Sequence, residues 1–431
     1  MNTTRIVPLA TLFPGLSPLR HRNALLYFSG LTVSQCGDWM ETTTTSWLLY
    51  QITGDPALLG LGGAIRAAAI ILFGLIGGAV ADRTDRRRLL LITQCGFATT
   101  SLVLGLLVLD GRLSFWHIYA FAAANGALES IDSPARRAIF PMLVHRSEMQ
   151  SAVVLNSTVF RLARLVGPAI AGVSIALYGP AVSYFVNVVS YVAILGALLF
   201  MRVPTMPERR TAPLMREVVD GLRYTLRRPL LRAVLVMEST HSLFGVNTAL
   251  ITILASDVLH SGPQGLGLLL SAQALGALIG TMGLVMIGDM ERKGRAMMIS
   301  GVAYCVALAL LSFARRFEVA ALLLVLTTVA DAFWTAMRNT MFQLHTDDAY
   351  RGRSMSTLLL AGRGFTQAAQ LETGIAVSIA GLPFAILSGA AVIALAMGAV
   401  NARTAEVRSF RGIPDAVPAS AATELGGGGE G

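Results

Sequence analysis

Apolar runs of about 18–25 residues follow one another along nearly the whole chain, and this pattern limits the possible folds more than any other feature. A helix rises about 1.5 Å per residue, so one such run crosses a hydrocarbon core of about 30 Å. Only 14% of the residues are charged and 54% are apolar, whereas roughly 25% of a soluble domain is charged. The sequence therefore predicts an all-α integral membrane protein.

We predict twelve transmembrane helices that form two pseudo-symmetric six-helix bundles. The predicted spans are 24–49, 58–80, 89–109, 114–133, 150–176, 181–201, 232–255, 265–288, 296–313, 319–343, 355–379 and 383–401. The loop at 202–231 is long and rich in proline and arginine. We expect it to be a cytoplasmic linker between an N-terminal bundle at 23–201 and a C-terminal bundle at 232–402.

Two polar tails flank the predicted bundles. Residues 1–22 contain three prolines and lack the compact apolar stretch and cleavage site of a secretory signal, so we expect a cytoplasmic tail. Residues 403–431 end in a glycine-rich segment with little to bury, so we expect a disordered cytoplasmic tail.

Arginine and lysine are distributed unequally between alternate loops. With the N-terminus inside the cell, about 26 basic residues fall in cytoplasmic segments and about 3 in outer loops. Short cytoplasmic loops carry the basic excess of membrane proteins. We therefore predict a multi-pass protein of the inner cell membrane with both termini in the cytoplasm.

Composition and motifs argue against several other classes of protein. The net charge of +9 comes from short clusters between apolar runs, not from one basic face, so nucleic acid is not expected as a partner. The three cysteines lie far apart in sequence and have no metal-ligand spacing, so neither a metal nor a cofactor is expected. The catalytic motifs HExxH and GxSxG and the P-loop are absent from the sequence, which disfavours an enzyme and an ATP-driven pump.

Weak similarity between the two halves indicates an internal repeat, which is typical of secondary transporters. A shift of 202 residues places Glu129 on Asp331 and Arg136 on Arg338. A shift of 200 residues places Asp38 on Glu238. Charged positions therefore recur in corresponding helices.

Ionisable residues within the predicted spans indicate where a polar path runs. A charge near the bilayer centre costs roughly 2.5–3.5 kcal/mol on insertion scales, so it must face protein or water. Predicted helices 3, 6, 9 and 12 carry no such charge and are expected to face lipid. The candidates for proton coupling or for a substrate cavity are Asp38, Glu41, Thr45, Arg66, Asn125, Glu129, Arg161, Arg164, Glu238, His241, Asp331, Trp334, Arg363 and Gln367.

Two interpretations of these charges remain open. Residues three, four or seven apart share a helix face, so several of these side chains form stripes that can line a translocation path. Alternatively, the charges pair with one another and tie helices together. We favour the structural role for Asp132, Arg136, Arg137 and Arg338, near the cytoplasmic ends. We favour function for Asp38, Glu41 and Glu129, because a buried carboxyl group can bind a proton on one side and release it on the other.

The loop after the second predicted span contains Gly78-Ala79-Val80-Ala81-Asp82-Arg83-Thr84-Asp85-Arg86-Arg87-Arg88. This segment resembles the G-x-x-x-D-R-x-G-R-R/K signature of the major facilitator superfamily, with Asp85 where glycine is usual. A degenerate copy, Glu291-Arg292-Lys293-Gly294-Arg295, follows the eighth span. The resemblance implies a cytoplasmic gating motif in which Asp82 binds a helix N-terminus and nearby arginines. The candidate gating residues are Gly78, Asp82, Arg83, Arg86, Arg87, Asp132, Arg136 and Arg137.

Further segments resemble one branch of that superfamily, which holds enterobactin exporters and macrolide efflux proteins and is known as the transmembrane secretion effectors. They are Gly37-Asp38-Trp39-Met40, Asp132-Ser133-Pro134-Ala135-Arg136-Arg137, Gly167-Pro168-Ala169-Ile170-Ala171-Gly172 and Arg351-Gly352-Arg353-Ser354-Met355-Ser356. The third segment is similar to an antiporter motif, and Gly167, Pro168 and Gly172 are candidate helix-packing residues. Ala122 stands where many exporters of the superfamily carry an arginine, which departs from the usual proton-coupling arrangement.

The resemblance implies the major facilitator fold and a monomeric secondary transporter in the lipid bilayer. Such a transporter would export a small organic molecule, such as a drug, a macrolide or a siderophore. We expect it to work by proton antiport with alternating access. Proton-coupled uptake of a small solute is the alternative. A membrane enzyme or sensor on the same scaffold is a third hypothesis.

Overall fold

The computed structural model describes residues 14–139, 142–201 and 214–410. Helices dominate this part of the chain, which contains no β-strand within those ranges. The N-terminal group of long helices comprises α2 (Arg22–Thr53), α3 (Pro56–Arg83), α4 (Arg86–Leu109), α5 (Phe115–Ile139), α6 (Met149–Tyr178) and α7 (Ala181–Phe200). The C-terminal group comprises α9 (Pro229–Phe244), α10 (Thr248–Ile253), a π-helical turn at Leu254–Val258, α11 (Gly262–Ile287), α12 (Lys293–Leu311), α13 (Phe317–Leu344), α14 (Arg351–Ala380) and α15 (Leu382–Arg403). Short 3-10 turns lie at Pro14–Arg20, Arg146–Glu148 and Asp348–Tyr350.

Nine spans within the described ranges are long and apolar enough to cross a membrane. The remaining long helices, α2, α5 and α14, have 32, 25 and 30 residues but carry more polar side chains. Large apolar residues such as Ile92, Val189 and Leu395 are 63%, 68% and 72% exposed on outward helix faces. Such faces suit a lipid environment, where each helix satisfies its own backbone hydrogen bonds. The chain is thus a multi-pass membrane protein.

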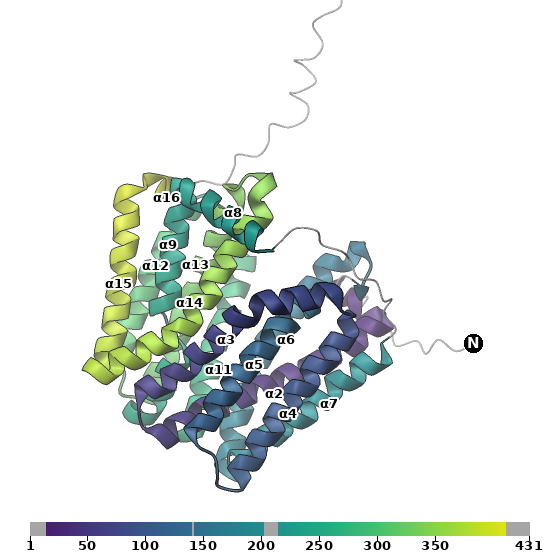
Figure 1. The fold of residues 1–431 in the computed structure, drawn as a ribbon. Coiled ribbons are helices and arrows are strands. Elements are labelled where there is room, and N and C mark those ends of the chain that lie inside the picture. Colours follow the sequence, from purple (N-terminus) through teal and green to yellow (C-terminus); the bar gives the residue numbers. More distant parts are fainter. Residues whose placement is uncertain (1–13, 140–141, 202–213, 411–431) are drawn as a thin grey trace, which may run out of the picture.

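The two groups of helices contact each other where the start of α3 meets the end of α14 and the end of α6 meets the start of α11. We call this end the closed end, and the turns at Gly54, Gly179, Gly262 and Gly381 adjoin these helix ends. α3 and α14 lie together there and diverge toward the opposite end, the open end, where α8 (Leu214–Arg227) lies (Figure 1). α6 and α11 form the second large contact between the groups.

The turn between α2 and α3 shows how the sequence sets a helix boundary at the closed end. Gly54 ends α2 in the left-handed conformation, with φ of 59°, and its N–H donates to the carbonyl of Tyr50 at 2.8 Å. The Asp55 side chain then accepts from the Ala57 N–H at 2.7 Å, and Pro56 occupies the first turn of α3. Glycine at the C-terminus and aspartate with proline at the next N-terminus are standard signals of a helix break.

Two regions differ from the sequence-based expectation. The predicted span 232–255 is not one continuous helix, because the backbone is non-helical from Gly245 to Asn247 between α9 and α10. The Asn247 side chain caps α10 by accepting from the Leu250 N–H at 3.0 Å. The tail predicted to be disordered from 403 onward instead forms α16 (Ala405–Ser409), while residues 411–431 lie outside the described ranges.

The predicted domain boundaries remain predictions. Most of the tail 1–22 and part of the linker 202–231 lie outside the described residues, but α8 occupies residues 214–227 of that linker. α8 packs against α14, and Tyr224 stacks on Tyr350 with ring centroids 4.4 Å apart.

Candidate transport site

Asp38 and Glu41 on α2 point toward α4 and α7, inside the N-terminal group of helices. The Tyr191 hydroxyl donates to Asp38 at 2.5 Å, and the Gln35 amide donates to it at 2.8 Å. Glu41 is buried and accepts hydrogen bonds from the Ser101 hydroxyl and, at 2.7 Å, from the Asn187 amide. Both carboxyl groups are therefore held within one half rather than between the halves.

Arg66 of α3 and Glu129 of α5 form an ion pair near the middle of their helices. The guanidinium donates to one carboxylate oxygen at 3.2 and 2.9 Å. The two side chains are 36% and 43% exposed. Charges with this exposure at this depth require a wet environment, since contact with lipid would be costly.

The C-terminal half holds a second group of ionisable side chains on α9 and α13. Glu238 and Arg338 form an ion pair whose side chains are only 7% and 9% exposed. His241 lies 3.5 Å from Asp331 and stacks on Trp334 at 5.3 Å between ring centroids. Trp334 is fully buried, whereas the Asp331 side chain is 38% exposed. Asp331 is thus the accessible member of this group.

The two accessible carboxylates, Glu129 and Asp331, occupy the positions that the 202-residue shift relates. Each lies beside a basic group on another helix, namely Arg66 on α3 and His241 on α9. The internal repeat of the sequence thus relates the two carboxylates, but their basic partners come from non-equivalent helices, the second of one half and the first of the other.

Arginines on α6 connect the two halves through neutral partners. Arg161 donates to the Thr281 hydroxyl of α11 at 2.9 Å. Arg164 donates to the Gln273 amide oxygen at 3.0 Å and stacks over the Trp39 ring at 5.3 Å. Both guanidinium groups therefore bind neutral side chains of the opposite half.

Three candidate polar residues have partners close by. Thr45 lies 2.9 Å from the Tyr184 hydroxyl, and Asn125 accepts from Thr100 at 2.8 Å. Gln367 accepts a hydrogen bond from the Gln370 amide at 2.8 Å, and both residues lie on α14. The Gln370 side chain also lies against Gly63 of α3. Gln367 therefore lies close to the contact between the halves.

Small residues of the antiporter-like segment allow α6 to approach two other helices. A Cβ atom added at Gly167 would lie 2.6 Å from the Trp39 Cβ of α2. One added at Gly172 would lie 2.6 Å from the Pro263 carbonyl oxygen of α11. The Pro168 carbonyl lies against Gly267 of α11 in the same way. The segment thus packs α6 both within its own half and against the other half.

The loop between α3 and α4 makes contacts that its motif did not reveal. Asp85, which replaces the usual glycine, caps α4 by accepting from the Arg88 N–H at 2.8 Å. Arg87 donates to the carbonyls of Leu198 and Leu199, at 2.5 and 2.6 Å, and so binds the C-terminal end of α7. Arg86 lies 3.5 Å from the Met142 sulfur. The side chains of Gly78, Asp82, Arg83 and Arg363 lie outside the described part of the structure.

Asp132 is the centre of a buried hydrogen-bond network at the open end of α5. Its carboxylate accepts from Thr93 and Gln94 of α4 at 2.7 and 2.8 Å and from Arg136 at 2.5 Å. Arg137 donates to Ser133 at 2.8 Å on the same helix. This geometry suits a tie between helices.

At the closed end, polar side chains bridge the two halves directly. The Tyr50 hydroxyl of α2 donates to Asp257 at 2.5 Å, and Ser46 lies 2.9 Å from the Thr252 hydroxyl of α10. Ser378 donates to Asp55 at 3.4 Å. These contacts join the two halves at this end.

Sequence reasoning missed the polar residues of α4 and α7, the third and sixth predicted spans, which were expected only to face lipid. Ser101 of α4 and Tyr184, Asn187 and Tyr191 of α7 hold the α2 side chains described above. The spacing of 184, 187 and 191 places these residues on one helix face, which the sequence could have indicated. Charge alone was an incomplete criterion, because neutral donors solvate the buried carboxylates.

Known proteins share this sequence pattern and fold. The model of a family described as transmembrane secretion effector matches residues 14–418. The staphyloferrin A transporter of Staphylococcus aureus is 26% identical over 83% of this chain and 90% of its own length. The enterobactin exporter EntS of Shigella boydii is 25% identical over 71% of this chain and 73% of its own length. The fold is shared with a bacterial homologue of the human lysosomal transporter Spinster, which was solved in an inward-facing, unoccupied conformation. The TM-score is 0.67 and the sequence identity is 15%, and the match covers 91% of this chain and 99% of that one.

The family match covers nearly the whole chain, and the arrangement of helices agrees with it. These observations exclude the hypothesis of a membrane enzyme. The chain belongs to the transmembrane secretion effector family of the major facilitator superfamily and is a transporter of small molecules.

Proposed function

We propose that this transporter exports a siderophore or a similar small organic molecule across the inner membrane by proton antiport. Its termini face the cytoplasm, and it works as a monomer within the bilayer. The relatives named as staphyloferrin A transporter and enterobactin exporter support this substrate class.

One observation carries the proposal. Half-exposed charged side chains, Arg66, Glu129 and Asp331, lie within long membrane-spanning helices between two halves that contact each other mainly at one end. Such charges are tolerated where water reaches them. A space of this kind, closed at one end, is what alternating access requires.

Glu129 and Asp331 are the proposed coupling groups. When either carboxylate is ionised, a hydrogen-bond donor or cationic group of the substrate can bind to it. A proton that arrives from the opposite side neutralises the carboxylate and displaces the substrate. Asp38 and Glu41 act in this proposal as secondary polar groups, since neutral donors already bind both of them: α7 donates to Asp38, and α4 and α7 donate to Glu41.

Rocking of the two halves converts binding into transport. In the present conformation the closed-end contacts hold α2 against the α10 region. The gating motif at the open end closes in the opposite conformation, in which Asp82 binds a helix N-terminus and neighbouring arginines. A helix N-terminus carries about half a positive charge, which favours that contact. Asp82→Asn should therefore reduce turnover.

The test uses inverted membrane vesicles from cells that produce the protein. Enterobactin and staphyloferrin A are supplied outside, and the vesicle interior is made acidic. An exporter that works by proton antiport accumulates one of these compounds, and an uncoupler abolishes accumulation. Accumulation only in right-side-out vesicles would instead establish uptake, and accumulation that ignores the pH gradient would remove the proton from the mechanism.

A further inference from the structure

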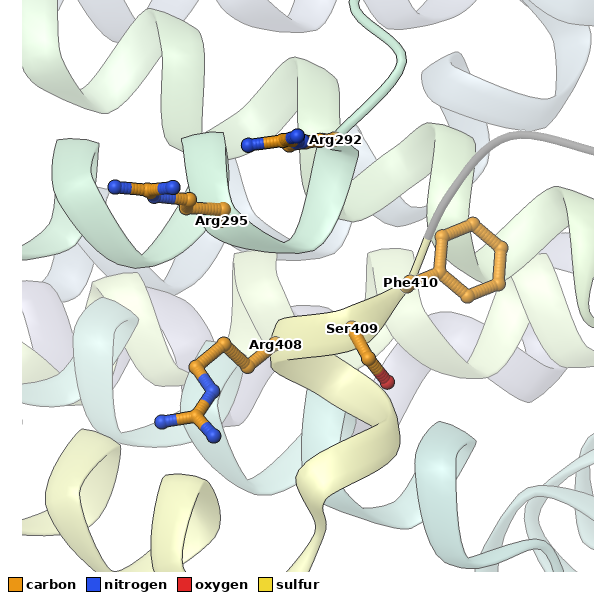
Figure 2. Close-up of a pocket in the computed structure, with 5 residues that line it drawn as sticks. All are labelled: Arg292, Arg295, Arg408, Ser409 and Phe410. Carbon is orange, nitrogen blue, oxygen red and sulfur yellow. The ribbon is translucent and has the colours of Figure 1, made fainter.

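A basic pocket lies at the open end of the C-terminal half, away from the space between the halves. Arg292, Arg295, Arg408, Ser409 and Phe410 line it, and its volume is about 280 Å³. Figure 2 shows Arg292 and Arg295 at the start of α12 and Arg408 on the facing segment, α16. Three arginine residues thus line one small hollow.

The tail helix is fixed in place, which gives the pocket a defined shape. Val407 of α16 is fully buried. The Gly294 N–H of α12 donates to the Phe410 carbonyl at 3.2 Å. A Cβ atom added at Gly294 would clash with the Val407 carbonyl, so the degenerate copy of the gating motif requires glycine where α16 docks.

The pocket arginines form no ion pair with their acidic neighbours in the chain, Glu291 and Glu406, within the described residues. Arg292, Arg295 and Arg408 are exposed, and none of the three forms an ion pair within the part of the chain that the structure describes. Lys293 pairs with Asp289 at 2.7 Å instead. The first turn of α12 adds the partial positive charge of a helix N-terminus.

An apolar strip leads from the pocket along the outer face of α12. Arg295 is followed at helical spacing by Ile299, Val302, Val306 and Leu310, which are 60%, 57%, 53% and 52% exposed. Because residues three or four apart share a helix face, the arginine and the strip form one continuous surface. Basic groups at the end of a lipid-facing strip match a molecule with an anionic head and apolar chains.

We propose that this pocket binds the headgroup of an anionic phospholipid from the leaflet at the open end. The phosphate contacts Arg292, Arg295 and Arg408, and one acyl chain lies on the strip from Ile299 to Leu310. The bound lipid would join α12 to α16, two segments far apart in sequence. This inference is independent of the transported substrate.

The experiment measures binding of phosphatidylglycerol to the purified full-length protein in detergent by native mass spectrometry. Phosphatidylcholine is the neutral comparison lipid. Each arginine near an anionic lipid surface contributes about fivefold in affinity, so the triple variant Arg292→Gln, Arg295→Gln, Arg408→Gln should bind phosphatidylglycerol roughly 100-fold more weakly. Its affinity for phosphatidylcholine should stay unchanged.

A matched control removes the same charge elsewhere. Arg112, Arg315 and Arg316 are also exposed but lie at the closed end, and their triple replacement by Gln should leave the affinity for phosphatidylglycerol as in the parent protein. Equal losses in both triple variants would overturn the proposal, because the effect would then be one of net charge. The single variants Arg295→Gln and Arg408→Gln, with an expected loss of about fivefold each, test it even where the triple variant fails to fold.

Inorganic phosphate distinguishes a lipid from a soluble anion. Millimolar phosphate should not displace phosphatidylglycerol, because it lacks the chains that contact α12. Displacement by phosphate alone, together with no effect of Val302→Ser/Val306→Ser on lipid affinity, would overturn the assignment of a lipid.

Discussion

Arg66 of α3 places two nitrogen atoms against one carboxylate oxygen of Glu129 on α5, at 3.2 and 2.9 Å, while both side chains remain more than a third exposed. Glu129→Gln removes the negative charge and the site of protonation but keeps the side-chain shape. We expect proton-driven accumulation in inverted vesicles to fall at least tenfold, while equilibrium binding of the substrate stays measurable. Glu318→Gln, an exposed position at the start of α13, is the matched control and should transport normally. Coupling through Glu129 is refuted if the Glu129→Gln variant retains full accumulation.

The buried pair Glu238 and Arg338 should matter for stability. Arg338→Met leaves the Glu238 carboxylate, only 7% exposed, without its cationic partner. Breaking a buried ion pair costs about 3–5 kcal/mol, so the thermal midpoint in detergent should drop clearly. The double variant Glu238→Gln/Arg338→Met should recover most of that loss, since it leaves no buried charge. A double variant as unstable as Arg338→Met would mean that packing, rather than the ion pair, sets the stability here.

Close packing of α6 on α11 should depend on Gly172. In Gly172→Ala, the new Cβ atom would lie 2.6 Å from the Pro263 carbonyl oxygen, which is too close for van der Waals contact. The two backbones must therefore move apart. Overpacking of this kind typically costs about 1–3 kcal/mol. Thermal unfolding should show the loss, and transport should slow. Gly196→Ala on α7 is the control, because no atom lies within 4 Å of its added Cβ. Identical thermal midpoints for the two variants would contradict the packing role.

Closure between α2 and α10 can be trapped chemically. The Ser46 and Thr252 hydroxyl oxygens are 2.9 Å apart, so Ser46→Cys/Thr252→Cys should form a disulfide on oxidation. With Cys36, Cys95 and Cys305 replaced by serine, the cross-linked protein should lose transport and regain it after reduction. Each single cysteine variant should be insensitive to oxidant. Full transport by a completely cross-linked sample would show that the halves need not separate at this end.

Apolar length and turn residues allowed most helices to be predicted from the sequence. The predicted bounds of the first span, 24–49, fall within α2, and the Gly54-Asp55-Pro56 break follows from local backbone preferences. The break at Gly245 was missed, because its local signals are only one glycine and one capping asparagine within a span of membrane-crossing length. The order around α16 was missed for another reason. Val407 is buried only after the chain folds back onto α12, a contact that spans more than a hundred residues.

The sequence predicted which residues belong to the candidate site better than it predicted which side chains contact one another. The sequence identified Asp38 and Glu129 equally, because both are carboxylates within spans. Their environments differ, since α4 and α7 supply neutral donors to the α2 carboxylates, whereas Arg66 supplies a cation to Glu129. Which helix face meets which neighbour depends on the rotation of each helix in the bundle. That rotation arises from packing and is weakly encoded in any single helix.

The non-helical residues between α9 and α10 divide one membrane span into two helical pieces that contact different helices. The α9 piece is anchored by Glu238 and His241 to the ring and ion-pair contacts of α13. The piece from Thr248 to Val258 carries the Thr252 and Asp257 contacts with α2. Because no continuous helical hydrogen-bond ladder crosses Gly245 to Asn247, bending there ruptures no regular helix. Neighbouring helices supply the missing partners, since the Val246 N–H donates to the Tyr304 hydroxyl of α12 at 2.9 Å and the Asn247 amide donates to the Thr373 hydroxyl of α14 at 2.7 Å. The break is therefore held by three helices at once, so that a shift of α12 or α14 is transmitted to it directly.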